Sequence, residues 1–264
     1  MKRLVMFAAV AAVLTSCQIF GIVTETGNGV VTEMTLVVKD FDALSVPAMI
    51  DVVYTQTPGD QSLTFTCDEN LVDYYLIEVK GNTLVVDTQP GILSLTPRVN
   101  TVLTVNSPVL NSVKLSGSGD CTINSPISAE DGFKVSTSGS GDIEINGDVT
   151  CKSFSASTSG SGEIEISGIK SKSAEFTTTG SGDIEVDMIT ADRIKASTSG
   201  KGNISLVCKD AGDIEARTSG SGSIYLSGNA RSLDQKSSGS GRVKIENFSV
   251  QDNFKIENFS VQHN

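Results

Sequence analysis

The amino-acid sequence predicts an all-β fold: a single-stranded parallel β-helix, with coils of about 20 residues, behind an irregular β N-terminal part. Three observations predict it. Between Gly117 and Gly241 a Gly-x-Gly pair occurs seven times, and successive first glycines lie 22, 21, 20, 20, 20 and 19 residues apart. Alternating apolar and polar residues follow each pair, and a second alternating run precedes most pairs. Such a period is typical of one supersecondary unit stacked on copies of itself.

Each Gly-x-Gly pair is expected to form the same corner in successive coils. Glycine has no Cβ and takes positive φ at no steric cost, so we expect the corner to need glycine for its backbone conformation. The expected corner glycines are Gly117, Gly119, Gly139, Gly141, Gly160, Gly162, Gly180, Gly182, Gly200, Gly202, Gly220, Gly222, Gly239 and Gly241.

The alternation predicts two strands in each coil. Asp142-Ile143-Glu144-Ile145 directly follows one corner, and Phe154-Ser155-Ala156 precedes the next. A period of two indicates a strand with one buried face. Because neighbouring coils would hydrogen-bond about 4.8 Å apart, we expect Ile143, Ile164 and Ile184 to stack in one interior. Lone apolar residues mark a third side at Val149, Ile169 and Ile189.

The first sixteen residues resemble an export signal. Lys2-Arg3 precede an apolar run from Leu4 to Leu14, which is too short to span a bilayer and suits a secretory core. Leu14-Thr15-Ser16-Cys17 resembles the lipobox of bacterial lipoproteins, in which the cysteine becomes the acylated N-terminus. We therefore predict a lipoprotein signal peptide over residues 1–16. An ordinary cleaved signal with an incidental cysteine is the alternative.

Acylation of Cys17 would anchor the chain to a membrane of the bacterial cell envelope, and we favour the outer membrane. Residues 17–29 would then form the lipidated N-terminus and a tether. Without residues 1–16, 18 basic residues stand against 31 acidic ones, a net charge of −13. This balance opposes nucleic acid as a partner and suits a solvated exterior.

The other cysteines indicate neither a disulfide framework nor a metal site, and we expect no cofactor. Cys121 stands where other coils carry isoleucine, so it is expected to be a small buried hydrophobe. Cys151 and Cys208 lie at different offsets from their corners, and no C-x-x-C spacing occurs.

Between Val30 and Leu115 the pattern stays β, but the repeat is irregular. We expect a hairpin turn at Gly81-Asn82 and a short helical turn within Asp68–Tyr75. We interpret these segments as the irregular first coils and the cap of the solenoid, because an uncovered strand at its end would invite edge pairing. They belong to one domain over residues 30–246, in which the regular repeats cover residues 117–242. The expected strands are Val30–Val38, Leu44–Val46, Ile50–Tyr54, Leu63–Cys67, Leu76–Val79, Leu84–Val86 and Val102–Val105.

Several motifs occur in an order that resembles one family. Val38-Lys39-Asp40-Phe41-Asp42-Ala43-Leu44 comes first, Val79-Lys80-Gly81-Asn82-Thr83-Leu84 follows, and the repeated Ser-Gly-Ser-Gly-Asp-Ile occurs with Ile145-Asn146-Gly147. Over residues 36–246 the chain resembles the auto-transporter adhesin, head GIN domain family. The resemblance implies a right-handed β-helix of the pectin-lyase type without its catalytic residues, in secreted proteins with a proposed role in adhesion. It implies no functional residue.

Residues 247–264 depart from the repeat. The octapeptide KIENFSVQ occurs at Lys244–Gln251 and again at Lys255–Gln262, an offset of 11 residues that does not match a coil. We expect the first copy to end the β-helix and the second to cap it or to trail from it. A partner-binding strand is the alternative.

The residues give little support for catalysis. The sole histidine, His263, lies in the tail, so serine and cysteine nucleophiles lack an imidazole base in the coils. Serines and threonines beside the corners, such as Thr158-Ser159, are expected to hydrogen-bond locally. The carboxylates are stronger candidates, and they are expected to stack in two outward columns at Asp142, Glu144, Glu163, Glu165, Asp183 and Glu185. We interpret them as a solvated acidic face, with a calcium site as the weaker alternative because flat columns converge poorly on one ion.

We therefore predict a non-enzymatic cell-envelope lipoprotein, a β-helix scaffold for adhesion to, or interaction with, envelope or extracellular protein or glycan partners. The alternative is a polysaccharide-binding or polysaccharide-degrading protein of pectin-lyase-like architecture. An array-type binder built on Ser-x-Ser rows is a third class. The outward columns change from acidic at Asp142 to basic at Arg242 along the coils, which favours head-to-side or end-to-end contacts between molecules, or docking of a charged polymer.

Overall fold

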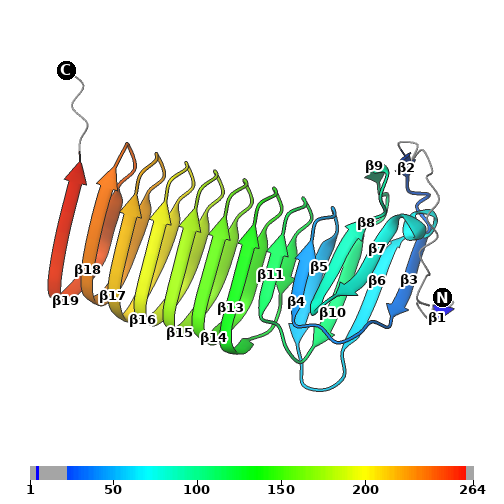
Figure 1. Ribbon diagram of the computed structural model, residues 1–264, viewed down its shortest axis with the longest axis horizontal. Helices are drawn as coiled ribbons and strands as arrows, with labels where there is room; N and C mark the ends of the chain where they lie inside the picture. Colours follow the sequence, from blue (N-terminus) through cyan, green and yellow to red (C-terminus); the bar gives the residue numbers. More distant parts are fainter. Residues whose placement is uncertain (1–3, 6–22, 260–264) are drawn as a thin grey trace.

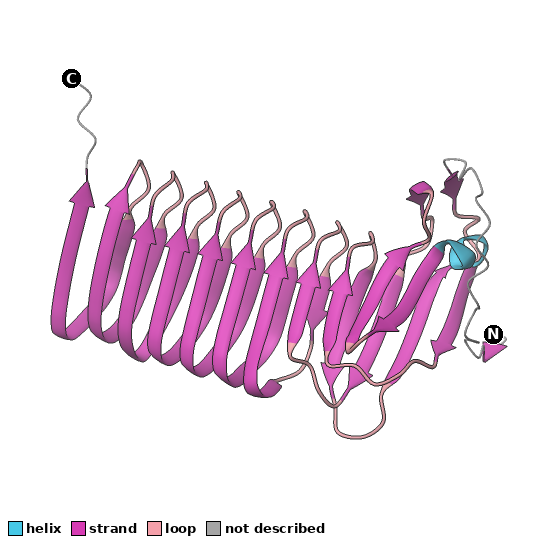
Figure 2. Ribbon diagram, viewed as in Figure 1, coloured by secondary structure: helices cyan, strands magenta, loops and turns pink. Residues whose placement is uncertain are grey.

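The computed structural model describes residues 4–5 and 23–259, and these are mostly β-strand (Figure 1). A regular solenoid forms the C-terminal part, and shorter, irregular strands lie at its N-terminal end. One short 3-10 helix, η1 (Glu69–Tyr74), occurs among the described residues, within the segment predicted to hold a helical turn (Figure 2). The predicted all-β solenoid is confirmed.

The irregular end consists of short strands that agree with the predicted ones. β7 and β8 form the predicted hairpin, in which Lys80 pairs with Thr83 and Gly81 takes a φ of 63°. The strands are β1 (Leu4–Val5), β2 (Val23–Thr26), β3 (Val31–Leu36), β4 (Ala43–Val46), β5 (Asp51–Gln56), β6 (Ser62–Asp68), β7 (Tyr75–Lys80), β8 (Thr83–Thr88), β9 (Ile92–Thr96), β10 (Val102–Ser107), β11 (Ser112–Leu115) and β12 (Cys121–Ile123).

These strands also form the first coils of the solenoid. β4 pairs in parallel with β11, which pairs with β13, and β5 pairs with β12, which pairs with β14. At the far end β3 and β10 pair antiparallel with β6, β1 pairs in parallel with β3, and Leu71 of η1 is fully buried. Antiparallel strands and a helical turn therefore close the N-terminal end, as the cap interpretation requires.

The regular coils are long strands that bend around the solenoid. Strands of 15 to 16 residues, such as β14 to β18, exceed the usual length because each one bends along the coil. Each strand pairs in parallel with the next. The strands are β13 (Ile127–Thr137), β14 (Ile143–Thr158), β15 (Ile164–Thr178), β16 (Ile184–Thr198), β17 (Ile204–Thr218), β18 (Ile224–Ser238) and β19 (Val243–Phe259).

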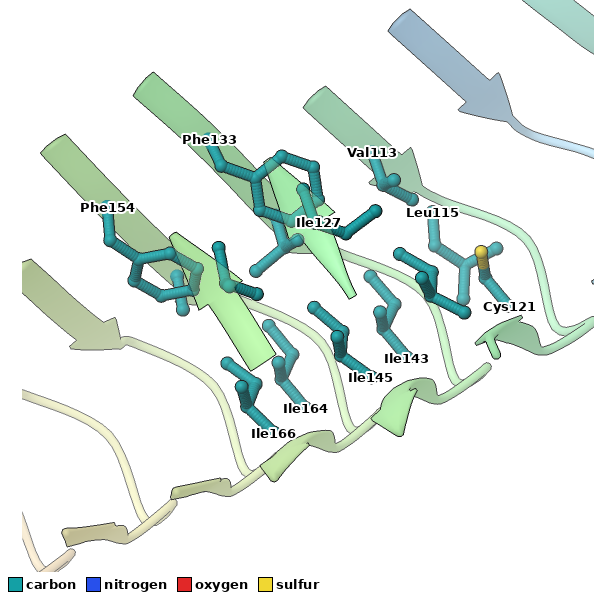
Figure 3. Packing of buried hydrophobic residues seen from close by; sticks show 14 of the residues in the cluster. Val113, Leu115, Cys121, Ile127, Phe133, Ile143, Ile145, Phe154, Ile164 and Ile166 are labelled. Atoms are coloured by element: carbon teal, nitrogen blue, oxygen red, sulfur yellow. The ribbon is translucent and has the colours of Figure 1, made fainter. Parts of the chain in front are cut away.

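The interior consists of columns of identical or similar apolar side chains. Ile143, Ile164 and Ile184 stand in register and are 0% exposed, which confirms the predicted stack. Figure 3 shows Ile143 and Ile164 facing Phe133 and Phe154 of the opposite strand segments across one core. Cys121 pairs in register with Ile143 and is fully buried, as predicted. All four cysteines of the described residues are free.

Large and small side chains alternate on the phenylalanine side of the core. Phe154 and Ala156 stand in register with Ala174 and Phe176, so the large residue changes column between two coils. The Phe154 and Phe176 rings lie 5.8 Å apart between centroids, and Phe133 lies 6.3 Å from Phe154. Phe133 stands in register with Phe154, so the change of column occurs between Phe154 and Phe176, where each ring packs beside a small alanine of the neighbouring coil.

Two predictions at the chain ends are wrong in part. Within the predicted tether over 17–29, residues 23–26 form β2, which pairs in parallel with β9. Within the predicted tail over 247–264, residues up to Phe259 belong to β19 and pair with β18 as a full coil. In both cases the partner strand supplies backbone hydrogen bonds that the sequence period does not reveal.

The corner glycines are needed for a different reason from the predicted one. Of the corner glycines, all within the described residues, Gly239 is the one with a positive φ, 91°. At Gly180 a Cβ would instead collide with the backbone carbonyl oxygen of Gly160, one coil earlier. That oxygen accepts hydrogen bonds from Ser181 N at 2.9 Å and Gly182 N at 3.1 Å. Glycine is therefore required because the backbones of adjacent coils are in contact, which corrects the prediction from backbone conformation.

We expect Gly180→Ala to lower the free energy of unfolding by about 2–3 kcal/mol, because the new Cβ would push the corner away from Gly160. Ser181→Ala changes an exposed side chain of the same corner and should alter stability by about 0.5 kcal/mol or less. Urea denaturation of both variants measures the difference, and equal stabilities would contradict the contact argument.

Candidate binding groove and acidic strip

An open groove crosses the outer face of the strand segments that precede the corners. It has a volume of about 770 Å³ and extends from Asn111, beside β11, across β13 to β18. Two in-register columns provide its polar lining. One column is Gly132, Ser153, Ser173, Arg193, Asp213 and Ser232, and the other is Lys134, Ser155, Glu175, Lys195, Glu215 and Asp234.

The register of the coils gives the groove a repeated chemical pattern. Glu175, Lys195 and Glu215 occupy one outward column, so charges of opposite sign follow each other at the strand spacing of about 4.8 Å. Lys195 Nζ lies 3.1 Å from Glu175 Oε1. Both side chains are about half exposed, so water screens this pair and leaves the charges accessible to a ligand.

A second set of ion pairs holds the acids at the C-terminal end of the groove. Arg231 Nη2 lies 2.6 Å from Asp213 Oδ2, and Ser232 Oγ donates to Asp213 Oδ1 at 2.6 Å. These hydrogen bonds, from Arg231 first, lower the pKa of Asp213 to about 2. The hydrogen bond from Arg217 likewise lowers the pKa of Asp234. Both carboxylates are therefore ionised at neutral pH.

The predicted acidic columns lie on the strand segments that follow the corners, on another side of the coil. Glu144, Glu165 and Glu185 stand in register and are exposed, which confirms one column. The acids of the other column, Asp142, Glu163 and Asp183, each lie directly after a corner glycine. We call the six residues together the acidic strip.

The corner acids bind backbone amides of the next coil. Asp142 Oδ1 accepts a hydrogen bond from Glu163 N at 2.7 Å, and Asp183 Oδ1 accepts one from Asn203 N at 2.6 Å. Asp142 N in turn donates to Asp120 Oδ1 at 2.9 Å. A short side chain with an oxygen acceptor is therefore useful at this position whether or not it carries a charge, which gives the column a structural role.

Glu163, the third acid of this column, has a raised pKa. Its partial burial is the main cause, and the charges of its acidic neighbours, led by Glu165, add to it. Among the residues that the structure describes, no group of three or more His, Cys, Asp or Glu side chains is placed to hold a metal ion.

Buried threonines brace the inner side of the same corners. Thr158 Oγ1 donates to Gly162 O at 3.0 Å, and Thr198 Oγ1 donates to Gly202 O at 2.8 Å. This confirms that hydroxyl side chains beside the corners hydrogen-bond locally. They form part of the scaffold and are not positioned as nucleophiles.

Sequence reasoning identified the acidic strip but missed the groove. The groove acids and bases, such as Arg193 and Asp213, lie on the polar positions of the second alternating run, which was interpreted only as a strand. Comparison of those polar positions from coil to coil would have revealed a second charged column. Cys17 and His263, the predicted acylation site and the sole histidine, lie outside the described residues.

Stacked coils, in-register outward columns and an open groove define a β-solenoid that displays polar side chains in repeated rows. The family model described as "Putative auto-transporter adhesin, head GIN domain" matches residues 40–211 and again residues 171–257. The chain belongs to this family. The two matches overlap, as expected where similar coils repeat.

Solved structures have the same fold. A crystal structure described as a putative adhesin from Bacteroides fragilis has a TM-score of 0.69 and 24% identity, over 89% of this chain and 99% of that one. A putative adhesin from Parabacteroides distasonis has a TM-score of 0.71 and 21% identity, over 84% and 100%. A protein of that organism described as a putative lipid binding protein has a TM-score of 0.70 and 24% identity, over 90% and 100%.

The comparison with curated proteins found no match. The described residues form no helix of the length and apolar character that a membrane span requires.

We expect Asp142→Ala to lower the free energy of unfolding by about 1 kcal/mol, because Glu163 N would lose its carboxylate acceptor. Asp142→Asn retains an oxygen acceptor and should keep most of the stability. Thermal or urea unfolding of the pair separates the two roles of the residue. If Asp142→Ala and Asp142→Asn lose the same amount of stability, the charge of Asp142 accounts for the loss and its hydrogen bond does not.

We expect Arg231→Gln to raise the pKa of Asp213 from about 2 toward the ordinary value of about 3.9, and Ser232→Ala to raise it less. A lowered folded-state pKa stabilises the fold above the unfolded value, and this contribution is lost as the pH falls through about 2. The Arg231 variant should therefore show a weaker loss of stability between about pH 4 and pH 2. Carboxyl titration by NMR measures the shift, and an unchanged Asp213 curve would contradict the pairing.

Proposed function

We propose that this chain is a non-enzymatic lipoprotein of the bacterial cell envelope, in which the β-solenoid acts as a scaffold for adhesion or for interaction with envelope or extracellular partners. The observation that carries this proposal is the groove across β13 to β18 with its repeated polar rows. An extended partner with repeated polar groups could contact several rows at once, and linked weak contacts add strongly to affinity. Membership of an adhesin family supports the same role.

The anchor is part of this proposal. Cys17, in the lipobox-like Leu14-Thr15-Ser16-Cys17, would carry the acyl chains and hold the solenoid at the outer membrane. Residues between Cys17 and β2, which begins at Val23, would link the anchor to the folded domain. Mass spectrometry of the membrane-extracted chain tests the acylation directly.

The charges of the groove support binding without catalysis. A glycosidase needs two carboxyl groups in a cleft, one of them with a raised pKa that lets it act as an acid. In the groove, Asp213 and Asp234 have lowered pKa values. Glu163, the carboxyl group with a raised pKa among the described residues, lies on the acidic strip instead.

Polysaccharide binding is the second candidate. The groove favours it because serine hydroxyls at Ser153, Ser155 and Ser173 lie beside charged side chains along the direction in which the coils stack. Hydroxyl and carboxylate rows of this kind suit the hydroxyl groups of a glycan chain. A glycan array distinguishes this partner from a protein of the envelope.

We expect the chain with Cys17→Ser, which cannot take an acyl anchor, to retain binding to envelope fractions or arrayed glycans. Adding Arg193→Ala and Lys195→Ala should weaken this binding about tenfold, because two cations of the groove are lost. Lys170→Ala with Lys172→Ala removes two exposed cations outside the groove and is the matched control. Biolayer interferometry measures both variants, and equal binding by them would contradict the groove assignment.

A further inference from the structure

Among the described residues, nothing covers the apolar interior of the solenoid at its last coil. β19 pairs with β18 along its length, and its other edge faces away from the solenoid (Figure 1). Phe254 and Ile256 stand in register with Leu233 and Gln235 of the coil before. Leu233 and Gln235 are 1% and 7% exposed, whereas Phe254 and Ile256 are 52% and 50% exposed. Two interior positions therefore lack the cover that each earlier coil receives from the next one.

The other end of the solenoid is closed. Antiparallel β3, β6 and β10, together with η1, cover the first coils. The two ends therefore differ, and a head-to-tail filament would need an open strand edge at both. Contact between the C-terminal ends of two copies needs only the open C-terminal edge of each. A twofold axis relates the two copies in such a contact, so the assembly stops at a dimer.

The five residues Lys-Ile-Glu-Asn-Phe that begin each copy of the octapeptide lie on both sides of the last coil. Lys244 and Ile245 pair with Tyr225 and Leu226, and the register shifts after them; Lys255-Ile256-Glu257 pairs with β18 from Asp234 onward. The offset of 11 residues, which does not match a full coil, corresponds to the step from one side of the coil to the other. Each side of the terminal coil thus carries the same strand sequence at its edge.

Lys-Ile-Glu is complementary to itself in an antiparallel strand pair. Residues directly opposite each other share one face of the sheet, and opposite charges there are favourable. With Ile245 opposite Ile245 of a second copy, Lys244 of each copy faces Glu246 of the other. The second copy of the motif allows the same backbone register around Ile256. The outward charges then match while the inward isoleucines meet in a continuous core.

We propose that a second copy of this chain covers β19, so that two solenoids join at their C-terminal ends as a twofold dimer. The interface extends the β-sheets by antiparallel pairing of β19 with β19 of the second copy, and it buries Phe254 and Ile256. Edge strands in soluble proteins are normally shortened, charged or covered. The 17-residue edge of β19 is charged, but it is not short, and no described residue covers it or the exposed apolar side chains beside it. This inference is independent of the groove and of its ligand.

The test measures the oligomeric state of the full chain with Cys17→Ser, so that no acyl anchor brings copies together. Analytical ultracentrifugation should show a dimer at about 100 µM protein, a concentration at which mass action favours even weak dimers. Glu246→Lys places like charges opposite each other twice in the dimer and should raise the dissociation constant about tenfold. Glu246 is exposed, and circular dichroism checks that the variant stays folded.

The charge swap Lys244→Glu with Glu246→Lys provides the decisive control. It restores opposite charges across the twofold axis and should recover dimerisation, although Lys244 also loses its contacts with Tyr225 within the chain. Recovery by the swap supports the proposed register, because a local structural effect would persist or worsen. A chain that stays monomeric at about 100 µM overturns the proposal. A dimer that forms only after removal of residues 260–264, or that is unchanged by Glu246→Lys, also overturns it.

Discussion

Backbone contact between adjacent coils at the glycine corners is the constraint on which the rest of the structure depends. The carbonyl oxygen of a corner glycine accepts amide hydrogen bonds from the next corner, and it occupies the space that a Cβ there would need. The later corner of each pair can therefore approach the earlier one only where its own residue lacks a Cβ. This contact repeats at every corner from Gly139 onward, so each coil takes its position from the one before it.

The same register produces both the core and the surface. It places Ile143, Ile164 and Ile184 in one buried column, and it places Glu144, Glu165 and Glu185 in an outward column of the same strand segments. On the segments that precede the corners, it aligns the mixed charges of the groove. A solenoid of this kind repeats similar outward side chains from coil to coil. Such rows suit an extended partner better than one small substrate in an enclosed site.

The two ends of the solenoid differ in how their strand edges are covered. At the N-terminal end, β3, β6 and β10 change to antiparallel pairing, and Asp68 accepts hydrogen bonds from the amides of Gly29, Arg98 and Val99. These contacts join segments about 30 to 40 residues apart. At the C-terminal end no such closure occurs among the described residues, and the last coil carries Lys-Ile-Glu-Asn-Phe on both of its sides.

The sequence by itself determined the coil period, the two strands of each coil, the isoleucine stack and the acidic strip, because each coil repeats one local environment and so repeats one pattern. Only the tertiary structure decided why the corners need glycine, since the colliding carbonyl of Gly160 lies 20 residues before Gly180. It also decided that residues 23–26 pair with β9, that both copies of Lys-Ile-Glu lie in one coil, and that Arg193 and Asp213 share a groove. These features depend on contacts between distant segments, and neither the alternation within a strand nor the glycine period records which segments meet.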